Sequence, residues 1–238
     1  MRPSRTWTLL GIPVHINPSW FIVVVFVAWS LARGYFPSHC PGLAAPTYWG
    51  MGIMAALLLF LCVVLHELGH ALVARGFGIR VVGMTLFLFG GVAQIANDPK
   101  RPAVEFLVAL AGPLVSGAIA WACWLAGSAI AVDSHASLIA ATILRYLAMI
   151  NLGLILFNLL PGFPLDGGRV LRAALWGITG NLRTATRIAS AIGSALGLGL
   201  IVMGVWLMVR GAGLHGLWYV FLGFFLRDAA LASLRRSQ

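Results

Sequence analysis

Two histidines and a glutamate stand close together inside an apolar stretch of the chain. His66-Glu67-Leu-Gly-His70 has the H-E-x-x-H spacing. Residues i and i+4 of a helix share one face, so both imidazoles can reach a single metal ion. Burying such groups in a membrane helix costs too much free energy for a purely structural role. The spacing therefore predicts a hydrolytic zinc site, with Glu67 placed to act as the catalytic base on a metal-bound water.

A third ligand is expected, because a catalytic zinc usually has three protein ligands and keeps one position open. The chain has only six acidic residues, and Glu67 is already assigned. Of the others, Asp98 and Glu105 flank the basic loop at residues 100–101, Asp133 lies on the outer side and Asp228 follows the last apolar run. Asp166 remains, within the segment 158–169, where two prolines break the fourth apolar run and two glycines follow the aspartate. We expect Asp166 to complete the site, since broken backbone at membrane depth is tolerated where it lines a cavity.

The elements that must position these groups are membrane helices. Hydrophobic residues make up 61% of the chain and charged residues 9%, far from the balance of a soluble domain. The apolar runs that can be marked are residues 20–31, 51–74, 103–130, 138–160, 188–209 and 217–226. We predict an all-α polytopic membrane protein forming a single domain over residues 1–238, with about six transmembrane helices. Residues 79–95 are too short to cross as a helix and are rich in β-formers, which predicts a short membrane-associated β-hairpin between helices 2 and 3.

The net charge of +10 does not indicate a nucleic-acid partner, because the basic residues lie between apolar runs rather than on one water-facing surface. Most of the 16 Lys and Arg residues fall on one side when the N-terminus, with Arg2 and Arg5, is placed inside. The positive-inside rule then predicts a multi-pass protein of the inner (plasma) membrane with both termini cytoplasmic. At a rise of 1.5 Å per residue, counted from the outer end of its helix, His66 is expected in the cytoplasmic third of the bilayer. The active site is therefore predicted near the cytoplasmic side.

The paired motifs resemble those of the site-2 protease family of intramembrane zinc proteases. The pair consists of His66-Glu-Leu-Gly-His70 and, over 158–169, Asn-Leu-Leu-Pro-Gly-Phe-Pro-Leu-Asp-Gly-Gly-Arg. Further similarity is found in Gly11-Ile-Pro-Val-His-Ile-Asn-Pro-Ser-Trp20, Phe89-Gly90-Gly91-Val92 and Ala111-Gly112-Pro113. The resemblance implies His66, His70 and Asp166 as ligands of one Zn²⁺ per chain, Glu67 as catalytic base, and a catalytic core at about residues 51–170. Members of that family often carry a PDZ insertion or a C-terminal nucleotide-sensing tail. This sequence has room for neither, so we expect either a minimal form or a chain cut short before such a tail.

The activity implied is regulated intramembrane proteolysis, in which a metal-activated water hydrolyses peptide bonds in or near transmembrane segments. The expected substrate is a single-span membrane protein: an anti-sigma factor, a membrane-tethered regulator or a signal-peptide remnant. Gly90 and Gly91 either let an extended substrate pair with the hairpin or only permit tight turns. Asn158 either bonds the substrate or holds the broken backbone near Pro161.

Three other classes of protein share some of these features. A metal transporter would place ligands at several depths, whereas the candidates here share one level. A catalytically silent scaffold would have lost Glu67 or a ligand, and all four residues are present. A membrane metalloprotease acting on prenylated proteins also has an H-E-x-x-H helix, but the ligand-bearing segment around Asp166 argues against that class.

Overall fold

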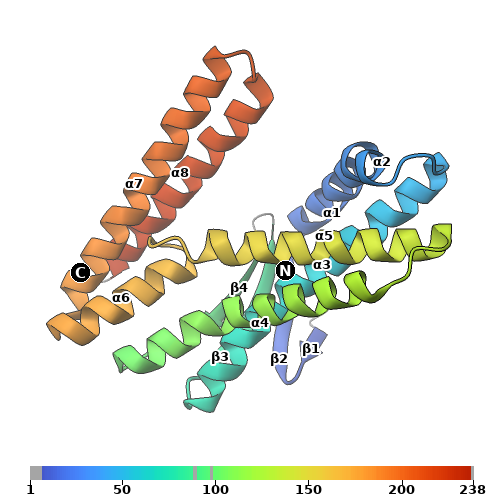
Figure 1. Cartoon of the computed structure of the whole chain (residues 1–238). Coiled ribbons are helices and arrows are strands. Elements are labelled where there is room, and N and C mark those ends of the chain that lie inside the picture. Colours follow the sequence, from blue (N-terminus) through green and yellow to red (C-terminus); the bar gives the residue numbers. More distant parts are fainter. Residues whose placement is uncertain (1–6, 88–89, 97–98, 237–238) are drawn as a thin grey trace. The chain divides into compact units, whose positions relative to one another are not determined.

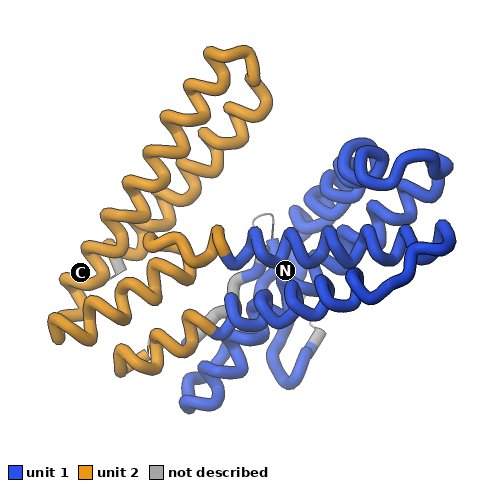
Figure 2. The backbone as a smooth tube through the Cα atoms, in the orientation of Figure 1, with its two compact units in different colours: residues 1–98, 111–155 blue, residues 99–110, 156–238 orange. Residues whose placement is uncertain are grey.

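Long apolar runs become helices in this protein, because a helix satisfies its own backbone hydrogen bonds where water is absent. The structure, a computed structural model, describes residues 7–87, 90–96 and 99–236. Arg2, Arg5, Phe89 and Asp98, used above, lie outside these ranges. The chain forms two compact units, residues 1–98 with 111–155 and residues 99–110 with 156–238 (Figure 2). Each unit is described by itself.

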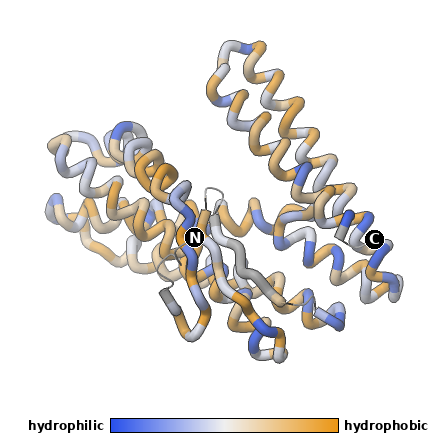
Figure 3. Tube along the Cα trace, turned by 180° about the vertical axis from the view of Figure 1, so that it is seen from behind, coloured by the Kyte–Doolittle hydropathy of each residue, from blue (hydrophilic) through white to orange (hydrophobic). Residues whose placement is uncertain are grey.

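Six helical segments of the described chain are long and apolar enough to cross a membrane (Figures 1 and 3). They are Ser19–His39, Ala45–Gly76, Pro102–Ala129, His135–Asn158, Leu182–Val209 and Gly213–Arg235. The predicted six-span, mostly helical fold is confirmed, and the chain is a multi-pass membrane protein. Several helices extend past the apolar runs marked in the sequence, because helical hydrogen bonding continues into their more polar ends.

The first unit combines helices with a small sheet. Its helical elements are α1 (Ser19–Ser30), a π-helical turn (Leu31–Tyr35), α2 (Phe36–His39), α3 (Ala45–Gly76), and the parts of α4 (Pro102–Ala129) and α5 (His135–Asn158) that fall in this unit. A core of Phe36, Met51, Ala55 and Tyr146 joins the first span to α3 and α5. The apolar side chains that predicted the spans therefore also hold them to one another.

The sheet of the first unit has four strands in the order β1-β2-β3-β4. They are β1 (Trp7–Leu9), β2 (Ile12–Ile16), β3 (Val81–Phe87) and β4 (Gly90–Ile95). The hairpin predicted over 79–95 is confirmed as the antiparallel pair β3–β4. The N-terminal hairpin was not predicted, and it adds β2 parallel to β3. Ile12 and Met84 of this sheet are buried against Leu68 and Ala71 of α3, so the sheet packs on the helix that carries the two histidines.

In the second unit, α7 (Leu182–Val209) and α8 (Gly213–Arg236) form an antiparallel pair. Gly197 and Gly204 of α7 meet Gly223 and Gly216 of α8, and a Cβ on any of them would collide with the carbonyl of its partner. A spacing of seven residues is two helical turns, so each pair of glycines lies on one face. Small residues at that spacing let membrane helices pack backbone to backbone.

The second unit also contains α6 (Asp166–Thr179), an amphipathic helix too short to span the membrane. Gly180 ends it in the left-handed conformation, with φ 66°, and Asn181 caps α7 by accepting from the Thr184 amide at 3.1 Å. We had not predicted this helix. The sequence carries its stop signal in Gly180-Asn181, but the two glycines at its start are poor helix formers and conceal the beginning.

Candidate metal centre

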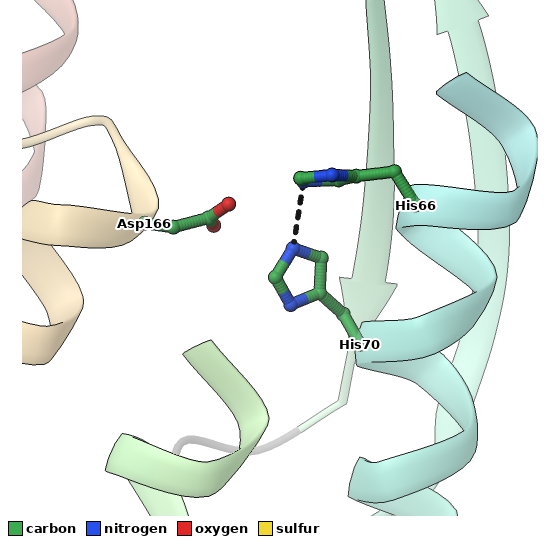
Figure 4. A group of neighbouring side chains, drawn as sticks. All are labelled: His66, His70 and Asp166. Atoms are coloured by element: carbon green, nitrogen blue, oxygen red, sulfur yellow. Dashed lines mark hydrogen bonds between the residues drawn. The ribbon is translucent and has the colours of Figure 1, made fainter. Parts of the chain in front are cut away.

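The two histidines of the motif lie buried on one face of α3. Their Nε2 atoms are 3.2 Å apart, one helical turn from each other (Figure 4). Two nitrogens bound to one tetrahedral zinc at 2.0–2.1 Å would be separated by about 3.3 Å. The spacing of His66 and His70 therefore fits two ligands of a zinc ion.

Gly112 of α4 lies directly against these two ring nitrogens. A Cβ added there would lie 2.5 Å from Nε2 of His66 and closer still to Nε2 of His70. One turn along α3, a Cβ at Gly69 would lie 3.0 Å from the Ala111 carbonyl oxygen and 2.8 Å from Val115 Cγ2. The two glycines thus let α3 and α4 approach closely and leave the space at the nitrogen pair clear. In the sequence, Gly112 stands within the Ala-Gly-Pro motif, and no role was predicted for it.

Ser116 of α4 reaches the other nitrogen of the first histidine. Its Oγ is 2.9 Å from His66 Nδ1, and the serine is fully buried. Ser116 was not among the predicted site residues. The signal that could have found it is its position four residues after Gly112, which places both on the same face of α4.

Glu67 lies against the hairpin of the same unit. It is half-buried, and a Cβ on Gly91 would lie 2.6 Å from Glu67 Cγ and 3.4 Å from its Cδ. β4, which begins at Gly90, is one edge of the sheet formed by the described strands. The glycine predicted to face a substrate therefore lies beside the predicted catalytic base.

Asp166 and Asn158 belong to the second unit. Asn158 is the last residue of α5. Asp166, which is labelled in Figure 4, is the first residue of α6. The turns between them are held by close backbone contacts: a Cβ on Gly168 would lie 2.6 Å from the Gly162 carbonyl oxygen. The amide of Phe163 donates to the carbonyl of Ala189 on α7 at 3.2 Å. These contacts fix the backbone that precedes Asp166.

A buried ion pair also holds α6 within the second unit. Arg172 Nε donates to Glu105 Oε1 at 2.6 Å, and a second guanidinium nitrogen contacts the same oxygen. The guanidinium also lies 5.0 Å from the ring centroid of Phe163. The sequence had suggested only that Glu105 flanks a basic loop. The signal for the pair is an acid in the first turn of a membrane helix, which requires a buried partner.

Comparison with known proteins agrees with this geometry. The model of peptidase family M50 matches residues 54–132 and 127–200. A putative zinc metalloprotease of Synechocystis sp. is 41% identical over 98% of the chain and 60% of its own length. Putative zinc metalloprotease Rip3 of Mycobacterium tuberculosis is 39% identical over 93% of the chain and 56% of its own length. The chain thus spans a little over half the length of these relatives.

A solved structure is similar as well. The site-2 protease from Methanocaldococcus jannaschii matches with a TM-score of 0.65 and 29% sequence identity, covering 96% of this chain and 94% of that one. Its name agrees with the resemblance drawn from the two motifs, and the relatives are named as zinc proteins, in keeping with the nitrogen pair on α3. The chain belongs to peptidase family M50, the zinc metalloproteases that include the site-2 proteases.

Proposed function

We propose that this chain is an intramembrane zinc endopeptidase that hydrolyses peptide bonds in or near transmembrane segments of membrane proteins. The observation that carries the proposal is the buried pair of imidazoles on a membrane-spanning helix, with a glutamate between them in the sequence. Such a pair buried in an apolar helix needs a function to offset its cost.

The proposed ligands of the single zinc ion are His66, His70 and Asp166. When bound, the metal would polarise the scissile carbonyl as a Lewis acid and would lower the pKa of a water molecule, so that this water can lose a proton and act as the nucleophile near neutral pH. Glu67 accepts the proton of that water and passes it to the leaving amine. The half-buried setting of Glu67, beside Gly91, supports this role, because a general base must be held within reach of the proton that it removes.

Asp166 is assigned as the third ligand from its place in the second of the two sequence motifs. Support comes from its position: it opens α6 immediately after the broken backbone at 159–165, and that backbone is anchored on α7. Residues 1–238 would then act as a single catalytic domain, with a core at about 51–170. Asn158, which ends α5, is the candidate for contacting the substrate carbonyl.

The substrate is proposed to bind as an extended segment along β4. A peptide bond inside a helix is shielded by the helix's own hydrogen bonds, so the substrate must unwind and find new backbone partners. An edge strand offers them by β-augmentation, and Gly90 and Gly91 allow a second backbone to come close. Substituting Leu at Gly90 should slow cleavage without changing zinc content, and unchanged cleavage would remove this role.

The partner class is a single-span membrane protein, such as an anti-sigma factor, a membrane-tethered regulator or a signal-peptide remnant. The arginine distribution supports an inner-membrane protein with both termini and the active site toward the cytoplasm. Fusing a reporter active only in the cytoplasm to either terminus tests the orientation, and activity from one terminus alone would contradict it.

The test of the activity uses purified chain in liposomes with a fluorescently tagged single-span test protein, whose products are sequenced by mass spectrometry. Glu67→Gln should lower the cleavage rate by about 10²–10⁴-fold, the usual contribution of a general base. Asp228→Asn, a matched change at an exposed acid on α8, should leave the rate unchanged. Zinc uptake into the same liposomes without cleavage would instead favour a metal transporter.

A further inference from the structure

The buried hydroxyl of Ser116 forms a hydrogen bond with Nδ1 of His66, the ring nitrogen that faces away from His70. Ser116 Oγ lies 2.9 Å from His66 Nδ1, and both residues are buried, the serine completely. The opposite ring nitrogen, Nε2, is the one that lies 3.2 Å from His70 Nε2 and against Gly112. The two nitrogens of His66 therefore have separate partners on opposite sides of the ring.

A histidine binds zinc through a nitrogen that carries a lone pair, so a metal at Nε2 requires the proton on Nδ1. A serine hydroxyl can accept that proton's hydrogen bond and can rotate to suit it. We infer that Ser116 is a positioning residue that sets the tautomer and the ring orientation of His66 for metal binding at Nε2. This inference rests on the proposed role of His66 as a zinc ligand.

The bond is not needed merely to hold α3 against α4. Gly69 already brings the two backbones into contact, with no room even for a Cβ beside Ala111 and Val115. A general packing role would be served by an apolar residue at position 116, since a buried hydroxyl without a partner costs free energy. What a hydroxyl adds at this place is a hydrogen-bond acceptor for one particular nitrogen.

The experiment measures zinc affinity of the full chain in detergent, by competition with a chromogenic chelator. Ser116→Ala should weaken zinc binding by about 10- to 100-fold, the usual effect of losing such an outer partner. Ser190→Ala is the matched control, because Ser190 is equally buried but its hydroxyl makes no hydrogen bond within the described part of the chain. Its affinity should equal that of wild type.

Two readouts separate positioning from general stability. The metal-free Ser116→Ala protein should unfold only slightly below the wild type, as expected for one lost hydrogen bond. The visible spectrum of the cobalt-substituted protein should change in Ser116→Ala and stay unchanged in Ser190→Ala. A third readout needs no variant. In the zinc-loaded wild type, histidine ¹⁵N shifts should show that His66 carries a proton at Nδ1 and none at Nε2.

The possible results test two separate claims: the role of Ser116 and the proposed function. Equal zinc affinity of Ser116→Ala and wild type, or a His66 protonated at Nε2 in the zinc-loaded protein, would overturn the role of Ser116 and leave the proposed activity intact. A wild-type chain that binds no zinc would overturn the proposed function itself. A weaker affinity with a changed cobalt spectrum supports the inference.

Discussion

The two units hold their proposed site residues by different means. In the first, the neighbouring helix α4 positions the side chains of α3. Ser116 provides a hydroxyl that bonds His66, and Gly112, which has no side chain, leaves space for the two histidine rings. In the second, Asp166 follows a loop held by its backbone, against Gly193 of α7, and α6 is anchored by an ion pair. The proposed reacting groups are predicted by sequence motifs. By contrast, many of the contacts that hold them come from glycines and from residues distant in the chain.

The largest effect, on zinc affinity, is expected from adding a side chain at Gly112 in the first unit. Gly112→Ala would push a methyl group against both Nε2 atoms and should abolish zinc binding, a loss of at least about 100-fold in affinity. Gly117→Ala is the matched control on the same helix, because its Cβ would meet only Ile155 Cδ1, at an ordinary 3.7 Å. Isothermal titration with zinc compares the two. Tight binding by Gly112→Ala would mean that the metal does not use this pair of nitrogens.

The ion pair of the second unit should have the next largest effect, on stability. Arg172→Met would leave the carboxylate of Glu105 buried without its cation, which typically costs about 3–5 kcal/mol. Arg183→Met, at an exposed arginine of α7, should change stability little. Thermal unfolding of the metal-free protein measures both. Adding Glu105→Gln to Arg172→Met should restore part of the loss, and equal stability of the two single variants would contradict the pair's importance.

The smallest effect is expected where the loop before Asp166 meets α7. Gly193→Ala would place a Cβ 2.8 Å from the Phe163 nitrogen and closer still to its carbonyl oxygen, so it should destabilise the protein by about 1–3 kcal/mol. Gly199→Ala, on the same helix with nothing within 4 Å, should instead stabilise by up to about 1 kcal/mol. Thermal unfolding should separate the two variants by several degrees. Identical unfolding temperatures would show that the loop is not held by this contact.

Local patterns were enough to predict the spans and the hairpin. Apolar runs of spanning length predicted six membrane helices, and the β-rich segment 79–95 predicted the β3–β4 pair. The N-terminal strands were missed because β1 and β2 are very short, and β2 pairs with β3, which lies far along the chain. The helix α6 was missed because glycines stand where a helix normally begins with stronger formers.

The sequence predicts the reacting groups that are proposed for the candidate site, and these assignments stay predictions. The H-E-x-x-H spacing predicts His66, Glu67 and His70. Asp166 is predicted by elimination, because the chain has few acidic residues. Ser116 is not predicted, because a single serine in a membrane helix more often bonds its own backbone than a distant ring. Which surfaces meet is decided by tertiary packing, and no local pattern in one sequence encodes it.

The central proposal is that His66, His70 and Asp166 are the ligands of one zinc ion. The zinc content of purified variants tests it most directly. Wild type and Glu67→Gln should each contain about one zinc per chain, and Asp228→Ala should match them as a control. Asp166→Ala should lose most of its zinc. A full complement of zinc in Asp166→Ala, or its loss in Glu67→Gln, would contradict the assignment of ligands and base.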